Sequence, residues 1–307
     1  MNDAAIGLLQ LDPEAVSRAA NFYMAYATTC QREREELASA DRRFGRPGQR
    51  PPSPDVLLME SASAYRKAAS WALLVDAAVG AQLLRAASDV FLELNFGYGV
   101  FLAALADEAT IRTEDFTATP HYWWGQLDFL LSSVARLQEA TGERTVDVPE
   151  PMRHPQQQVY AVLAAAAGSA GRSRDLALAV RERSGQLAGV LPVGALGTPI
   201  RRFWAVASGL LQDDLDVALA HIGAMTDRFA DQAESAMSDE ALWRDCHAGF
   251  EVVDLDIIGL TALTFRRFGR DRVLGTAEEE RTFRIPIGRS QMMIAAELDQ
   301  LLNDDGG

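Results

Sequence analysis

Apolar residues recur at the spacing of an α-helix along most of this chain, and this periodicity constrains its fold more than any other feature. Near the start, Asp12 suits the N-cap of a helix and Pro13 suits its first turn. The helix that follows is expected to run toward Leu37. Its apolar face consists of Val16, Ala20, Tyr23 and Ala27. Alternating β-branched runs are scarce, so the periodicity predicts an all-α protein.

Further helices are predicted after this one. A long helical region from Asp55 to Leu94 is expected to break near Gly80, because glycine is a poor residue for a helix interior. A turn at residues 95–99 then leads into a short helix at residues 100–105.

The C-terminal part is predicted to contain helices at residues 242–250, 255–268 and 291–302. The second of these should end at Gly269, since glycine is the usual residue after a helix. Between the last two helices, Phe283, Ile285 and Ile287 alternate around Pro286. This pattern predicts an extended strap packed on the last helix pair.

A motif in which a proline opens a helix with a large aromatic residue recurs in the second half of the chain. It starts at Pro120, Pro155 and Pro199. The last two copies match at an offset of 44 residues, which aligns Tyr160 with Trp204 and Val162 with Val206. Each leads into a second predicted helix, at residues 175–180 and 214–222. The spacing is close to the ~40–47 residues of HEAT-type units and predicts an elongated, right-handed, helical-repeat-like array of stacked helix hairpins.

The proline-rich stretch Arg46–Pro54 predicts an exposed loop, because it has four prolines and no periodicity. We expect it to lie within an N-terminal helical subdomain at residues 1–119. Residues 120–307 are then expected to form a helix-hairpin repeat subdomain that contains the acidic segment described next.

Negative charge is concentrated in residues 212–256. Twelve carboxylates and only two arginines, Arg228 and Arg244, give this segment −10 of the chain's net charge of −14. A field of one sign confined to one region favours a basic partner. The locally basic loop from Arg42 to Arg50 does not change this, because phosphates would be repelled by the remaining field, so direct nucleic-acid binding is not expected.

No run of apolar residues reaches the ~18 needed to cross a membrane, and residues 1–11 have no basic region followed by a long apolar run. Cys30 and Cys246 lie far apart and are expected to be small buried residues in a reducing compartment. We therefore expect a cytoplasmic protein without membrane contact.

Two acidic patterns raise the possibility of a metal site. Asp213, Asp214 and Asp216 resemble in composition the patches that hold magnesium in all-α isoprenoid synthases, but at the start of a helix they favour capping instead. A second group consists of His247, Glu251 and Asp254. These residues lie on one helix face only if a single helix runs through all three positions. Paired ligand motifs and nucleophile motifs are both missing, so we predict no metal, no cofactor and no catalytic residue.

Residues 198–288 resemble a known kind of protein. They combine an aromatic-centred helix at Arg202–Ala205, a Leu-Leu-x-Asp-Asp break, an Ala-Leu helix, an acidic linker, the helical stretch Asp256–Leu263 and a proline-containing tail. In this order they resemble the all-α immunity proteins of bacterial polymorphic toxin systems. The resemblance implies a protein that binds and blocks a cognate toxin, often a nuclease, without any catalysis of its own.

Charge and resemblance together predict a protein-binding module that neutralises a basic, nuclease-like toxin through an acidic face. Two alternatives stay open: a helical-repeat scaffold or regulator of a bacterial signalling or defence system, and an all-α metal-dependent enzyme. The aromatic residues Trp123, Trp124 and Trp204 are a second possible interface. The carboxylates expected to contact the partner lie around the linker after the second hairpin: Asp227, Asp231, Glu234, Asp239, Glu240 and Asp245.

Overall fold

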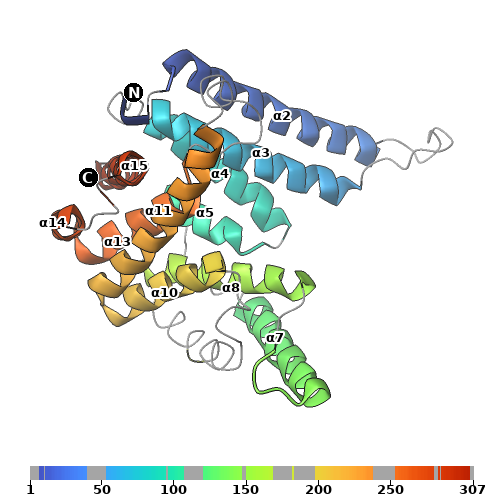
Figure 1. Ribbon diagram of the computed structural model, residues 1–307. Helices are drawn as coiled ribbons and strands as arrows, with labels where there is room; N and C mark the ends of the chain where they lie inside the picture. The colour runs from blue at the N-terminus through green and yellow to red at the C-terminus, as the bar shows by residue number, and fades with distance from the viewer. Residues whose placement is uncertain are drawn as a thin grey trace.

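The computed structural model confirms the all-α prediction: every regular element in the part of the chain that it describes is a helix (Figure 1). The described residues are 7–9, 11–39, 53–94, 96–106, 120–146, 150–168, 182, 198–237, 253–279, 283 and 285–304. Helices that follow one another along the chain pack together in pairs, as the hairpin prediction requires.

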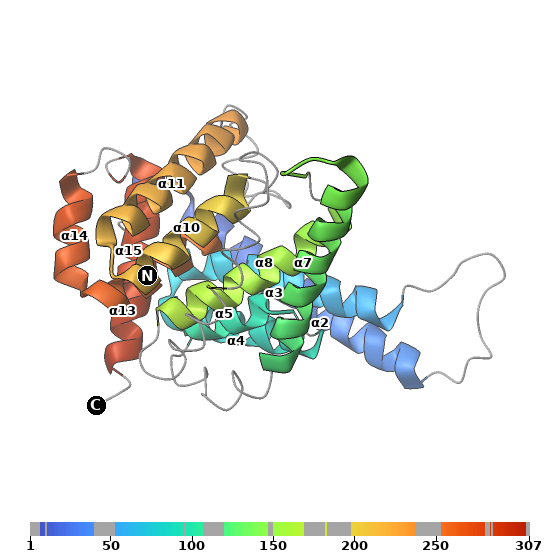
Figure 2. The ribbon, with the colours of Figure 1, turned by 90° about the horizontal axis from the view of Figure 1, so that it is seen from below.

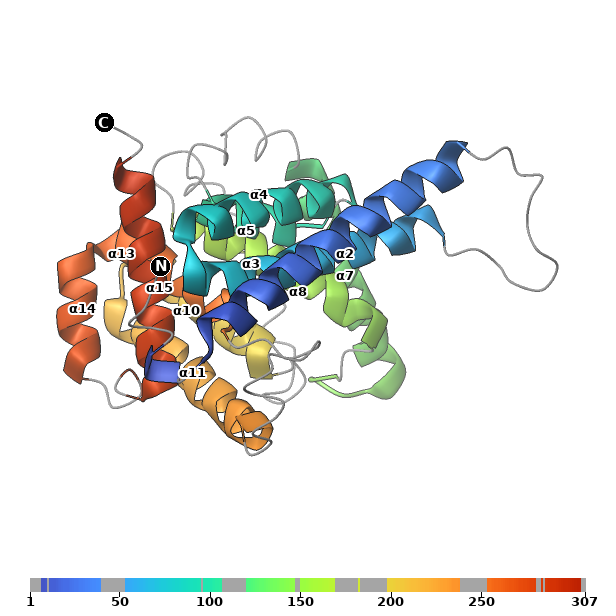
Figure 3. The ribbon, with the colours of Figure 1, turned by 90° about the horizontal axis from the view of Figure 1, so that it is seen from above.

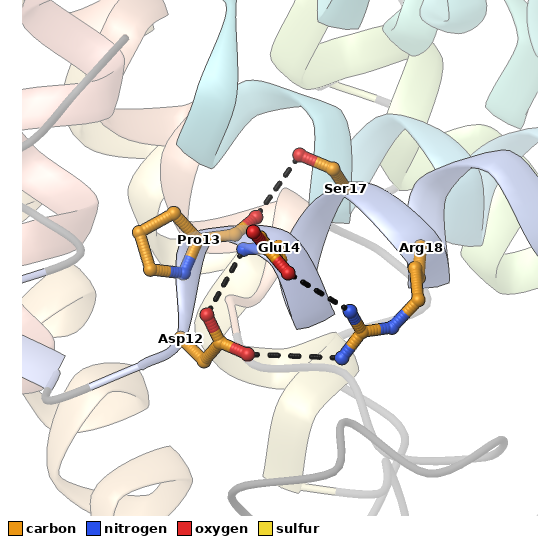
Figure 4. A network of polar contacts seen from close by, with 5 residues as sticks. All are labelled: Asp12, Pro13, Glu14, Ser17 and Arg18. Atoms are coloured by element: carbon orange, nitrogen blue, oxygen red, sulfur yellow. Dashed lines mark hydrogen bonds and ion pairs between the residues drawn. The ribbon is translucent and has the colours of Figure 1, made fainter.

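Helix α2 (Pro13–Ser39) begins where the sequence predicts. The Asp12 carboxylate accepts a hydrogen bond from the Glu14 amide at 3.1 Å, and the Arg18 guanidinium lies 3.7 Å from Asp12 and 3.6 Å from Glu14 (Figure 4). Negative charge at this end also suits the helix dipole. The buried face includes Val16, Tyr23 and Ala27, together with Cys30.

The helical region predicted from Asp55 to Leu94 consists of two helices, α3 (Pro54–Val75) and α4 (Ala77–Glu93). They are broken at Asp76 and not near Gly80, because the Asp76 carboxylate accepts hydrogen bonds from the amides of Ala78 at 2.9 Å and Val79 at 3.2 Å. Gly80 lies inside α4, where a Cβ would sit 2.5 Å from Leu73 Cδ2. Pro54, placed in the predicted loop, starts α3; residues 46–52 lie outside the described residues.

The next elements are α5 (Tyr98–Ala106), α7 (Pro120–Thr141), α8 (Glu150–Ala167), α10 (Thr198–Gln212) and α11 (Leu215–Met237). Helices α8 and α10, which carry the two matching copies of the proline motif, pack against each other. The matched residues Tyr160 and Trp204 meet there, with ring centroids 5.3 Å apart. The predicted helix at 175–180 lies outside the described residues.

Helices α13 (Leu255–Phe268), α14 (Arg270–Glu279) and α15 (Pro286–Asp304) complete the fold. Gly269, with φ 86°, ends α13 as predicted. The extended strap is wrong: Pro286 opens α15, and the Arg289 amide donates to the Ile285 carbonyl at 2.9 Å. Proline is well suited to a first helical turn, so the apolar alternation there marks a helix start. The predicted helix at 242–250 lies outside the described residues.

The array is not a simple elongated stack, because its end folds back on its beginning. Helix α15 packs against α4 as well as α13 and α11, and α13 contacts helices from both halves of the chain. The views from below and above show α13, α14 and α15 together at one end (Figures 2 and 3), and the view from above shows α2 running across the molecule (Figure 3). One continuous apolar core runs from α2 to α15. The division into subdomains at residues 1–119 and 120–307 stays a prediction.

Candidate functional site

The start of α11 explains the first acidic pattern. The Asp214 carboxylate accepts a hydrogen bond from the Val217 amide at 3.0 Å, so it caps the helix as predicted. Asp213 forms an ion pair with Arg267 of α13, and Asp216 is exposed in the first turn of α11. The three carboxylates therefore have different surroundings. Nowhere in the described residues do three metal-ligating side chains converge.

The outer side of α11 is an acidic face made of Asp216, Asp227 and Asp231, all of them exposed. Helical geometry places these residues within an arc of about 60°, and Asp216 and Asp231 are about 22 Å apart along the axis. The small residue Ala220 lies exposed between them. The opposite side of α11 is buried in the core through Leu215, Ala218, Leu219 and Ile222.

The predicted position of these carboxylates needs a correction. They were expected around a linker, but α11 continues to Met237, so Asp227 and Asp231 belong to a regular helix. Position 234 lies in the same helix, five turns after Asp216. The helix continues because residues 224–237 contain neither proline nor glycine. Asp239, Glu240 and Asp245 lie outside the described residues.

The described residues around this face also include positively charged side chains. Arg228 is exposed on α11, and the Arg202 guanidinium of α10 donates to the Ala224 carbonyl. His221 of α11 has its pKa lowered, first by burial and then by Arg202. At neutral pH His221 is therefore uncharged, and it adds nothing to oppose the carboxylates.

Of the second acidic pattern, the structure describes only Asp254. Asp254 has an extended backbone (φ −90°, ψ 112°), and its carboxylate accepts hydrogen bonds from the amides of Asp256 at 2.8 Å and Ile257 at 3.2 Å. Asp254 is thus the N-cap of α13 and cannot continue a helix from His247. Glu251 and His247 lie outside the described residues.

A polar network missed in the sequence joins α3, α5 and α13. The Tyr98 hydroxyl accepts a hydrogen bond from Arg66 Nε at 3.1 Å and donates one to Asp256 Oδ1 at 2.7 Å. Burial raises the pKa of Tyr98 well above its usual value. The hydroxyl therefore stays protonated and serves as a structural link. Tyr98 and Asp256 are 158 positions apart, so no local spacing could have signalled this contact.

Of the three tryptophans considered as a second interface, the structure describes only the side chain of Trp204. Tyr160 is buried and Trp204 is half-buried against it, which makes both part of the α8–α10 packing. The side chains of Trp123 and Trp124 lie outside the described part of the structure. Phe22 and Tyr26 of α2 are 58% and 44% exposed, and no pattern in the sequence marks them as surface residues.

Comparison with protein-family models, with curated proteins and with solved structures found no match. Of the helices that the structure describes, none is long and apolar enough to span a membrane.

Proposed function

We propose that this chain is a protein-binding module without catalysis, an immunity-type protein that neutralises a basic, nuclease-like toxin through the acidic face of α11. The observation that carries the proposal is the exposure of Asp216, Asp227 and Asp231 along one side of a helix whose other side is buried. Such a face is held by the core and loses little conformational entropy when a partner binds.

Electrostatics suit this role. A nuclease groove is positive because it holds phosphates, and carboxylates on a rigid helix can occupy that groove. Opposite fields on two partners also steer their encounter and raise the association rate at low salt. A proposed acidic face should therefore act mainly on the association rate, and its contribution should weaken as salt is added.

The proposal is tested by capture from cells of the source organism. Tagged wild-type protein is compared with the double reversal Asp227→Lys and Asp231→Lys, and co-eluting proteins are identified. A matched control reverses Glu33 and Glu35 of α2, which are also exposed, so that both variants have the same net charge. We expect a basic protein to co-elute with wild type and the control, and about tenfold less of it with the α11 variant.

Titration of the captured protein at low and moderate salt then separates the outcomes. Equal affinity for wild type and the α11 variant would show that the acidic face is only solvated. The toxin role is decided by expressing the captured protein alone: growth arrest that wild type relieves, and the α11 variant does not, supports neutralisation. A captured partner that causes no arrest would favour the scaffold or regulator alternative.

A further inference from the structure

Asp213, between α10 and α11, has an unusual backbone. Its φ is 60°, which makes it the one non-glycine residue with positive φ among those that the structure describes. The Asp214 amide donates to the Gly209 carbonyl at 2.9 Å, which is the pattern of a helix ended by a left-handed residue. Side chains with a Cβ are strained in this region, although aspartate tolerates it better than most.

Two other helices of this chain are followed by a glycine at the position with positive φ. Gly142 follows α7 with φ 70°, and Gly269 ends α13 with φ 86°. Asp213 therefore keeps a side chain where glycine would relieve the strain. An unusual backbone that persists in spite of its cost points to a function for the side chain.

The Asp213 side chain forms an ion pair with Arg267, the next-to-last residue of α13. The Arg267 side chain is only 17% exposed, whereas that of Asp213 is 54% exposed. Helix α13 is held in place by the core, because every residue from Ile257 to Phe265 is buried. At Gly259 it approaches α5 so closely that a Cβ would lie 2.6 Å from Phe101 Cζ.

The turn at Asp213 also leaves little freedom between α10 and α11. A Cβ on Gly209 would lie 2.9 Å from the Ala218 nitrogen and 3.0 Å from the Asp214 carbonyl oxygen, so the two helix backbones nearly touch. Helix α11 begins two residues after Asp213, and the ion pair with Arg267 connects this turn to α13.

We propose that Asp213 and Arg267 are positioning residues that fix the direction of α11 and hence of its acidic face. The statement that the acidic face binds a partner rests on the proposed function. The contact between Asp213 and Arg267, and its effect on the direction of α11, do not depend on it. In this arrangement Asp213 does not contact the partner. It holds in place the helix that carries Asp216, Asp227 and Asp231.

Hydrogen–deuterium exchange on the purified chain tests the contact without any partner. Arg267→Met and Asp213→Asn each remove one charge of the pair, and asparagine keeps the tolerance for positive φ. We expect the backbone amides of residues 215–222 to exchange about threefold faster in each variant than in wild type. The effect is modest because the ion pair is partly exposed. The double variant should exchange no faster than either single one, since both changes remove the same interaction. Arg267→Lys should restore most of the protection.

A matched control removes Arg34, which pairs with Glu93 between α2 and α4. Arg34→Met should accelerate exchange in those helices and leave residues 215–222 unchanged. The proposal is overturned if Arg267→Met leaves residues 215–222 as in wild type, or if it accelerates α2 to the same extent, which would indicate global destabilisation.

Binding of the captured partner provides a readout that a merely structural role would not change. Asp227→Asn should weaken affinity less in the Arg267→Met protein than in wild type, because the face is already displaced. Additive effects would contradict positioning. If wild type and the Asp227→Lys, Asp231→Lys variant bind equally, the proposed function fails, and the exchange data still decide the role of the pair.

Discussion

Two buried tyrosine hydroxyls in this protein show how the surroundings decide what a polar group contributes. The Tyr98 hydroxyl is bonded on both sides, to Arg66 and to Asp256. The Tyr160 hydroxyl is buried in α8 without a hydrogen-bond partner among the described residues. A bonded buried hydroxyl stabilises the folded state, whereas an unbonded one costs the free energy of its lost hydration.

Tyr98→Phe should therefore lower the free energy of unfolding by about 1–2 kcal/mol, while Tyr160→Phe should leave it unchanged or raise it. Burial also raises the pKa of Tyr160, so the unfolded chain loses this proton first as pH rises. The contribution of neutral Tyr160 to the free energy of unfolding is therefore fully present below about pH 10, and it falls as the pH rises further. Urea unfolding of both variants at pH 7 and pH 10.5 checks this. The assignment would be contradicted if the Tyr160→Phe protein were less stable than wild type at pH 7. It would also be contradicted if the variant lost as much stability as wild type between pH 7 and pH 10.5.

At the scale of helices, the sequence predicted which elements exist better than where they end. Apolar periodicity and the Asp12 cap placed α2 correctly, and Gly269 placed the end of α13. The break between α3 and α4 was assigned to Gly80, but glycine there serves close packing against Leu73, and capping by Asp76 makes the break. Local propensity cannot distinguish a glycine that ends a helix from a glycine that allows a neighbouring side chain to pack closely against the helix.

Two glycines inside helices test this distinction. Gly80→Ala should destabilise the protein by about 1–3 kcal/mol, because the new Cβ would meet Leu73 at 2.5 Å and overpacking outweighs the gain in helix propensity. Gly275→Ala in α14 meets no described atom within 4 Å, so it should stabilise by up to about 1 kcal/mol. Thermal unfolding of both variants gives the answer. A stabilising Gly80→Ala would mean that α4 is free to move away from Leu73.

At the scale of the whole molecule, contacts between distant parts of the sequence were beyond prediction. Periodicity gives each helix an apolar face but does not say which helix covers it, so the packing of α15 on α4 had no sequence signal. The acidic face was predictable in composition through Asp227 and Asp231. Its form as one side of a continuous helix, and the tie from Asp213 to Arg267, depend on how α11 and α13 meet.

A buried ion pair marks the place where the chain closes on itself. Arg266 of α13 lies 3.8 Å from Asp299 of α15, both side chains are 7% exposed, and Arg266 also donates to the Ala104 carbonyl of α5. Removing one charge deprives the other buried side chain of this ion pair, so Asp299→Leu should destabilise by about 3–5 kcal/mol. Arg266→Met combined with Asp299→Leu should recover most of that loss, because an apolar pair of similar size avoids the cost of burying charge. Urea unfolding of the two single variants and the double variant measures the coupling. Additive losses would show that the two side chains do not act as a pair, and the closure would then depend on apolar contacts of α15 such as Ile294 and Leu298.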